Sequence, residues 1–234
     1  MAEGWPRAVI FDLDGTLIDS VGDITDALNS ALTAARLRRF SDDEVRGLVG
    51  GGARVLIQRA LAAQAIEPNC PLGDRLYSNL LESYRLASVA RTTIYPGARQ
   101  LLSDLAERGV RLGICTNKPA EITEDVLRKL ELYECFQAVV GATEGLPKKP
   151  APAMLQATLT ALKVSVPEAV AIGDSIADVG AARAVGIPIV LVRSGYSAMP
   201  VEELGADAVI AALTDAPAAL AKLRPGRSPA RVSS

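Results

Sequence analysis

Four polar stretches of this chain contain the side chains that a phosphoryl-transfer site needs. Carboxylates can attack phosphorus, hold a metal ion and move protons, while a hydroxyl and a lysine can bind phosphate oxygens. Each stretch follows an apolar run typical of a buried strand, or lies in a loop close to one. In chain order they are Phe-Asp-Leu-Asp-Gly-Thr-Leu (11–17), Cys-Thr-Asn (115–117), Lys-Lys-Pro-Ala-Pro (148–152) and Gly-Asp-Ser-Ile-Ala-Asp (173–178).

The first stretch places two carboxylates close together. Asp12 ends the apolar run 7–11, and Asp14 lies in the turn that follows. One carboxylate can attack phosphorus, and the other can protonate the leaving oxygen and then deprotonate the water that cleaves the acyl phosphate. An Asp-x-Asp-Gly turn alone is a common surface feature. The buried strand directly before it favours a catalytic interpretation.

The second and third stretches offer ligands for a phosphate group. Thr116 follows the apolar run 110–115, so its hydroxyl and the next backbone N–H, that of Asn117, can bind phosphate oxygens at a helix start. Lys149 can neutralise the nucleophile and the phosphoryl group. A helix cap and a solvated loop lysine are the ordinary alternatives, and Lys148 is an adjacent competitor that the residues alone do not exclude.

The fourth stretch offers a metal site. Asp174 follows the apolar run 169–172, and Asp178 lies one helical turn later on the same face. Asp174 suits a magnesium ligand, with Asp178 as a second ligand or as a supporting residue. The alternative is that these acids cap the following helix. That role accounts well for one acid but less well for two.

Charge links the four stretches. The four aspartates can bring as many negative charges near one lysine, and a phosphate monoester adds nearly two more. At ~4 Å, like charges repel by several kcal/mol inside a protein. A working site therefore needs a divalent cation and an Asp14 that can stay protonated. Oxygen ligands and the absence of histidine favour Mg²⁺ over zinc or copper.

The periodicity of the chain predicts how these stretches meet. From Thr92 onward, short apolar strands alternate with amphipathic helices, which indicates an α/β fold with a doubly wound parallel, Rossmann-like sheet. Ligands bind outside the carboxyl edge of such sheets. The predicted strands are 7–11, 110–115, 138–140, 169–172, 187–192 and 208–210, and the helices of this part follow Pro96-Gly97 and cover 120–130, 151–162 and 175–185.

Residues 18–91 are predicted to be helical throughout, and we interpret them as a cap domain inserted over the carboxyl edge. The core domain is then discontinuous and consists of residues 1–17 and 92–223. Hinges near 17–20 and 92–96 would let the cap open and close. The polar tail 224–234 is rich in Pro and Gly and is predicted to be disordered. The cap helices are expected from Asp19 or Ser20 to about Arg36, after a capping box at Ser41, and over 53–65 and 72–90.

Composition excludes several classes of function. The chain has 234 residues, and its net charge of −2 gives no basic field for nucleic acid or membranes. The absence of histidine excludes a Ser-His-Asp triad and a histidine-ligated zinc site. Three widely spaced cysteines fit a reducing compartment, and no signal peptide or membrane span is visible. We therefore expect a cytoplasmic protein without nucleic-acid or membrane partners.

On these motifs the chain resembles the haloacid dehalogenase-like hydrolase superfamily, and within it the phosphoglycolate phosphatase group. The resemblance runs from residue 9 to about residue 220, with all four superfamily motifs in order. It implies that Asp12 is the nucleophile that becomes phosphorylated and that Asp14 is the general acid/base. It also implies that Thr116 and Lys149 bind the phosphoryl group, because Lys149 rather than its neighbour stands in the Lys-Pro-x-Pro register.

The same resemblance implies a magnesium site. Its ligands would be the Asp12 carboxylate, the Asp14 backbone carbonyl and Asp174, with Asp178 in support. Dehalogenase members of the superfamily lack the second aspartate of the first motif. The presence of Asp14 therefore favours phosphate chemistry over carbon–halogen cleavage.

One segment of the predicted cap also resembles the phosphoglycolate phosphatase group. Residues 49–54, Val-Gly-Gly-Gly-Ala-Arg, look like the glycine-bearing segment of those enzymes. Arg54 can meet a substrate carboxylate there, because a guanidinium suits that geometry. An arginine on the helix surface is an equal alternative.

The sequence thus predicts a magnesium-dependent phosphatase for a small anionic phosphomonoester, with 2-phosphoglycolate as the first choice. A phosphosugar or sugar-acid phosphate phosphatase, a pyrophosphatase and a sugar phosphomutase use the same chemistry and stay open. A non-catalytic binding protein is disfavoured, because Asp12, Asp14 and Asp174 are all present. A calcium loop is excluded by the spacing of the acids. A monomer or a homodimer is expected.

Overall fold

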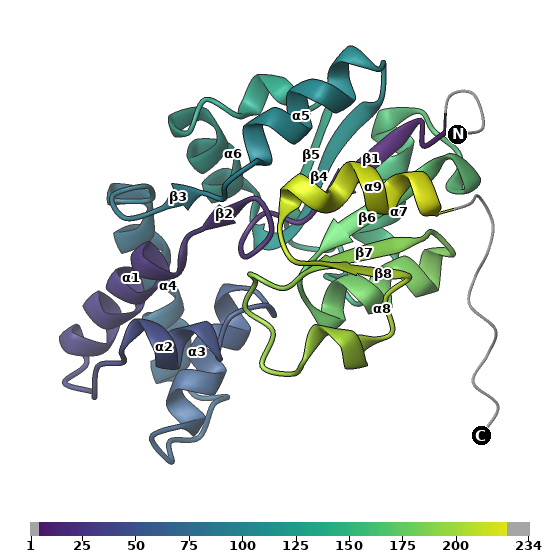
Figure 1. The fold of residues 1–234 in the computed structure, drawn as a ribbon. Helices are drawn as coiled ribbons and strands as arrows, with labels where there is room; N and C mark the ends of the chain where they lie inside the picture. Colours follow the sequence, from purple (N-terminus) through teal and green to yellow (C-terminus); the bar gives the residue numbers. More distant parts are fainter. Residues whose placement is uncertain (1–4, 224–234) are drawn as a thin grey trace, which may run out of the picture.

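A six-stranded parallel sheet lies at the centre of the computed structural model, which describes residues 5–223 (Figure 1). The strand order β5-β4-β1-β6-β7-β8 places β1 between β4 and β6. All neighbouring pairs are parallel, and the chain order reverses around β1. Polar residues that follow these three strands therefore meet at one edge. The strands are β1 (Ala8–Phe11), β4 (Arg111–Pro119), β5 (Ala138–Ala142), β6 (Ala169–Gly173), β7 (Ile189–Val192) and β8 (Ala208–Ile210).

Helices cover both faces of this sheet, which confirms the predicted fold class. Val9 and Phe11 of β1 pack in a core with α5, α6 and α9, whereas Ala8 and Ile10 pack in another with α7 and α8. Successive side chains of a strand point to opposite faces, so a strand covered on both sides is apolar throughout. These helices are α5 (Ala98–Glu107), α6 (Ala120–Lys129), α7 (Ala153–Leu162), α8 (Ile176–Val185) and α9 (Ala216–Lys222).

Four helices lie between β1 and α5 in the chain and gather beyond one end of the sheet (Figure 1). They pack with Leu13 and Leu17 of the first motif in the same apolar core as one face of the sheet. The capping box predicted at Ser41 is present at the start of the second. The helices are α1 (Val21–Ala34), α2 (Asp42–Arg46), α3 (Ala53–Ala62) and α4 (Pro71–Leu86).

A two-stranded ribbon connects these helices to the sheet. Strands β2 (Ile18–Asp19) and β3 (Thr93–Ile94) pair antiparallel where the chain leaves and rejoins the core. The buried Asp23 carboxylate accepts hydrogen bonds from the backbone N–H groups of Arg91 and Thr92, at 2.9 and 2.8 Å, and so ties the two crossings together. Strands of two residues are too short to show a periodic pattern, which is why the sequence did not predict the ribbon.

One predicted boundary near the site is wrong. The strand expected to end at Cys115 continues to Pro119, and its pairing with β5 is irregular between Cys115 and Pro119. Thr116 and the two residues after it are therefore strand residues, whereas α6 begins at Ala120, as predicted. Polar side chains do not reveal the end of a strand when a functional site takes the place of apolar packing.

The remaining features concern the chain ends and the short turns. The predicted disordered tail, 224–234, lies outside the described residues. Within residues 5–223, no helix combines the length and the apolar character that a membrane crossing requires. Short 3₁₀ turns occur at Tyr133–Cys135, Val166–Glu168, Val201–Leu204 and Leu213–Asp215.

Candidate active site

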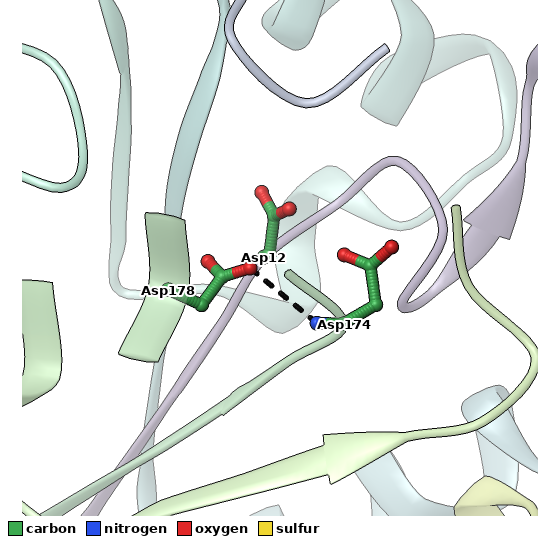
Figure 2. Close-up of side chains that lie close together, drawn as sticks. All are labelled: Asp12, Asp174 and Asp178. Carbon is green, nitrogen blue, oxygen red and sulfur yellow. Dashed lines mark hydrogen bonds between the residues drawn. The ribbon is translucent and has the colours of Figure 1, made fainter. Parts of the chain in front are cut away.

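Three carboxylates gather at the carboxyl ends of β1 and β6 (Figure 2). Asp12 directly follows β1, Asp174 directly follows β6, and Asp178 lies in the first turn of α8. One oxygen of each carboxylate lies within 4.8 Å of the corresponding oxygens of the other two. Since β1 and β6 are paired neighbours, the sheet topology brings together acids that are far apart in the sequence.

The turn after β1 fits closely against Asp174. Gly15 has a φ of +85°, and a Cβ on it would lie 2.5 Å from Asp174 Oδ2, so a larger residue would be strained and would clash. The backbone N–H of Tyr196 donates to the same Oδ2 at 2.7 Å. Thr16 Oγ1 lies 3.5 Å from Asp174 Oδ1. The turn that carries Asp14 therefore also fixes the position of Asp174.

Burial makes the negative charge of the cluster unfavourable. It raises the pKa of Asp12 from 3.8 to about 6, against the opposing effect of Lys149 and with a further contribution from Asp178. Burial also raises the pKa of Asp174 well above its usual value, and the neighbouring carboxylates add to this rise. A bound cation would restore the ionised forms of both groups.

The donor set fits a divalent metal ion. Asp12 Oδ1 is buried, and its close partner within residues 5–223 is Lys149 Nζ, at 3.0 Å. A carboxylate oxygen has two lone pairs, so Asp12 Oδ1 can take a further ligand beside Lys149. Convergent carboxylate oxygens are what a hard cation prefers. Asp14 is outside this side-chain cluster, and the prediction had assigned only its backbone carbonyl to the metal.

Lys149 is a buried cation at the centre of the site. Its Nζ lies 2.6 Å from Asp178 Oδ1 and donates to the Cys115 backbone carbonyl at 2.7 Å. Burial alone lowers the pKa of a lysine, but Asp12 and Asp178 outweigh it and hold the pKa of Lys149 above its usual value. The other Asp178 oxygen accepts hydrogen bonds from the Ser175 backbone at 3.1 Å and from its hydroxyl at 2.5 Å. Asp178 therefore links Lys149 to the start of α8.

Thr116 and Asn117 lie beside this lysine and differ in how they are used. Thr116 is buried and lines the cavity above the carboxylates. The Asn117 amide instead donates to the backbone carbonyls of Gly50 and Lys149, at 3.1 and 3.0 Å, and accepts from the Lys149 N–H at 3.0 Å. The Asn117 side chain thus connects the loop of Lys149 with the glycine-bearing segment 49–54 by hydrogen bonds.

Lys118 is a site residue that the sequence analysis missed. Its Nζ lies 2.9 and 3.1 Å from the two Asp14 carboxylate oxygens and donates to the Tyr84 hydroxyl at 2.5 Å. Burial lowers the pKa of Lys118, but Asp14 and Tyr84 outweigh it and raise the pKa. The expectation of one lysine among four acids is therefore corrected to two. Three consecutive polar residues, Thr-Asn-Lys, between an apolar strand and a helix were the available signal.

A cavity of about 860 Å³ lies over the site, between the sheet edge and the inserted helices. Arg54 lines it from α3, where its Nη1 forms an ion pair with Asp74 at 2.6 Å and its guanidinium lies 4.4 Å from the centre of the Tyr77 ring. The other lining residues relevant to the chemistry are Asp12, Asp14, Gly52, Tyr84, Thr116, Lys118, Lys148, Lys149 and Asp174.

This arrangement has known counterparts. Residues 9–192 match the family model of the haloacid dehalogenase-like hydrolases. The chain belongs to this family. The matched range begins within β1 and ends with β7, so this haloacid dehalogenase-like hydrolase carries its inserted helices and the aspartates and lysines of the site within the family region.

Relatives of this hydrolase include phosphoglycolate phosphatases. The protein of that name from Rhodospirillum rubrum is 42% identical over 208 residues, which cover 87% of this chain and 86% of that protein. The one from Caulobacter vibrioides is 38% identical over 211 residues, covering 90% and 89%. Among solved structures, CbbY from Rhodobacter sphaeroides in complex with phosphate has a TM-score of 0.76 at 25% identity, covering 88% of this chain and 94% of CbbY.

Proposed function

We propose that this protein is a magnesium-dependent phosphatase that hydrolyses 2-phosphoglycolate through a phosphoaspartate on Asp12. The observation that carries the proposal is the contact of Asp12 with Lys149 at a strand end, beside Asp174 and in a cavity that Asp14 also lines. A nucleophilic carboxylate, a cation for the phosphoryl oxygens and an adjacent acid are the parts of a covalent phosphatase. The relatives named phosphoglycolate phosphatase support the choice of substrate.

The reaction has two steps on the protein's own residues. Asp12 attacks phosphorus while Asp14 protonates the leaving oxygen, and Asp14 then takes a proton from the water that cleaves the acyl phosphate. Lys149 and Thr116 bind the phosphoryl oxygens from the β4 side of the site. Ser20 Oγ donates to Asp14 Oδ1 at 2.6 Å and, with Lys118, holds that carboxylate in place.

Mg²⁺ would neutralise the negative charge that these acids and the phosphoryl group bring together. Asp12, Asp174 and the Asp14 backbone carbonyl would hold it. Asp178 would support it indirectly, because its oxygens are already engaged by Lys149 and Ser175.

The inserted helices would act as a cap on this site. We assign residues 18–91 to the cap and 1–17 with 92–223 to the core, with the β2–β3 ribbon at the boundary. The cap contributes one wall of the cavity and would limit the substrate to a small molecule. A cytoplasmic location, a monomeric or dimeric state and the absence of nucleic-acid partners belong to the same proposal.

The test of function is phosphate release from a panel of phosphoesters with Mg²⁺. The panel should contain 2-phosphoglycolate, hexose phosphates, a sugar-acid phosphate and pyrophosphate, with product isomers analysed for mutase activity. We expect 2-phosphoglycolate to give the highest kcat/KM. A clear preference for a hexose phosphate, or isomerisation without phosphate release, would contradict the assignment.

Removal of the Lys118 ammonium should slow turnover, because Lys118 positions the Asp14 carboxylate. We expect Lys118→Met to lower kcat about 10²-fold, because the Asp14 carboxylate loses the cation that holds it within reach of the leaving oxygen. Tyr84→Phe keeps the lysine–carboxylate pair and should cost less than about tenfold, the loss of one hydrogen bond. Steady-state kinetics on the two variants measure both effects. Equal losses would show that Lys118 does not act through Asp14.

Magnesium should stabilise the fold more at high pH than at low pH. Since the pKa of Asp12 is raised to about 6 in the metal-free protein, the folded state holds an extra proton between pH 3.8 and about 6. The stability of the metal-free protein therefore falls as pH rises through that window. Bound metal requires the ionised carboxylates, and at about 100 times its Kd it adds about 2.7 kcal/mol.

Thermal unfolding with and without MgCl₂, near pH 5 and near pH 8, measures this difference. Asp174→Asn serves as the control and should remove most of the magnesium effect. An equal magnesium effect at both pH values, or an unchanged effect in Asp174→Asn, would contradict a site built on these carboxylates.

A further inference from the structure

Two adjacent lysines have opposite environments. Lys149 is buried among the carboxylates, whereas Lys148 is half-buried and faces the cavity on the cap side. A Cβ placed on Gly52 of the cap would lie 3.3 Å from Lys148 Nζ. The Lys148 ammonium has no hydrogen bond and no ion pair with any residue in the range 5–223, although the Lys149 ammonium has three close partners.

A second cation faces the same part of the cavity from the cap. Arg54 lines the cavity from the first turn of α3. Burial lowers the pKa of Lys148, and the charge of Arg54 adds to this effect. Within residues 5–223, only Nη1 of this guanidinium has a hydrogen-bond acceptor, the Asp74 carboxylate. The Tyr77 ring supports the guanidinium from one side and so restricts its position.

Lys148 is half-buried, whereas Arg54 is exposed and pairs with Asp74 through one nitrogen. The two cations repel each other, and an anion bound between them would relieve that repulsion. The segments that carry Lys148 and Arg54 are held together, because the Asn117 amide binds Gly50 of the cap and Lys149 of the core at the same time. Gly52 packs so closely on Asn117 that an added Cβ would lie 2.8 Å from the Asn117 carbonyl oxygen. The space beside Lys148 is therefore a cationic subsite next to the phosphoryl subsite of Lys149.

We infer that Lys148 and Arg54 together bind the carboxylate of the substrate, one from the core and one from the cap. This inference rests on the proposed function and deepens it by naming the residues that recognise the second anionic group. Two consecutive lysines then bind the two anionic groups of the substrate. Lys149 binds the phosphoryl group, and Lys148 binds the carboxylate. A small two-carbon substrate with an anion at each end suits this division, and a guanidinium can bind a carboxylate with two parallel hydrogen bonds.

The test compares two substrates of nearly equal size. One is 2-phosphoglycolate, and the other is 2-hydroxyethyl phosphate, in which a neutral CH₂OH group replaces the carboxylate. We expect Lys148→Met to raise KM for 2-phosphoglycolate roughly 10- to 100-fold, as for the loss of one charge-assisted hydrogen bond. The kcat for 2-phosphoglycolate and both constants for 2-hydroxyethyl phosphate should stay within about threefold, the change expected of a side chain outside the reacting groups.

A conservative variant separates charge from shape. Lys148→Arg keeps the cation and should bind 2-phosphoglycolate nearly as well as wild type. Arg54→Met should raise KM for 2-phosphoglycolate, as Lys148→Met is expected to do. Binding of 2-phosphoglycolate to the variants in an Asp12→Asn background, measured by calorimetry, should weaken in the same order. That measurement does not depend on turnover.

Failure of this inference and failure of the proposed function give different results. A wild-type enzyme without preference for 2-phosphoglycolate over 2-hydroxyethyl phosphate would contradict the proposed function. A wild-type preference that Lys148→Met leaves unchanged would overturn only the role of Lys148. Equal losses on both substrates would also overturn it, because they would place Lys148 at the phosphoryl group or in folding.

Discussion

Asp12→Asn is expected to reduce phosphate release by about four orders of magnitude or more, to the background rate. The reason is that an amide cannot form the acyl phosphate, and no other carboxylate occupies the end of β1 beside Lys149. A colorimetric phosphate assay with 2-phosphoglycolate and Mg²⁺ measures the loss. Acid-quench trapping of the phosphorylated protein should detect a labile phosphate on wild type and none on the variant.

The same substitution should leave the fold intact, which separates chemistry from stability. Burial raises the pKa of Asp12 to about 6, so ionised Asp12 is unfavourable in the metal-free protein near pH 8. A neutral asparagine removes that cost, and the metal-free variant should unfold at the same or a higher temperature. Turnover by folded Asp12→Asn at the wild-type rate would disprove the covalent mechanism.

Lys149→Met is expected to have the second largest effect, and it should affect both activity and stability. Loss of this cation should lower kcat about 10³-fold, because the phosphoryl group loses a buried positive charge. It should also destabilise the fold by about 3–5 kcal/mol, because Asp12 and Asp178 are left buried without their counter-ion. Steady-state kinetics and urea unfolding measure the two effects.

Lys148→Met is the matched control for this experiment. It removes the same charge one residue earlier, from a half-buried side chain without an ion pair in the described part of the chain. Its turnover of 2-hydroxyethyl phosphate and its stability should stay close to those of wild type. If the two variants behaved alike, the environments of the adjacent lysines would have no functional meaning.

The sequence predicted much of the core because its signals are local. The apolar runs that end at Phe11 and Ile172 became β1 and β6, and the helix that follows Ser175 ends at Gly186 as expected. Parallel strands buried on both faces must be apolar throughout, and this property can be recognised without knowing the neighbours of the strand. The fold class was therefore available before any coordinates, and the four motifs in order carried the resemblance to the family.

Contacts between distant segments were not available from the sequence. Thr116 and Asn117 were expected at a helix start, but they extend β4, and Lys118 after them reaches Asp14 and Tyr84. The β2–β3 ribbon is too short to have a pattern of its own. In each case the deciding interaction joins residues from different elements, so no local pattern encodes it.

The sequence thus indicated which residues belong to the site, and the tertiary structure decided which of them contact each other. Two aspartates after one apolar strand and two more after another could be assigned to phosphate chemistry, because strand ends of a parallel sheet share one edge. Which of the two adjacent lysines is buried among those acids, and which faces the cavity, depended on how the loop after β5 packs. The Lys-Pro-x-Pro register implied Lys149, but burial and charge pairing arise from the whole fold, so only the structure could show Lys149 among the acids and Lys148 at the cavity wall.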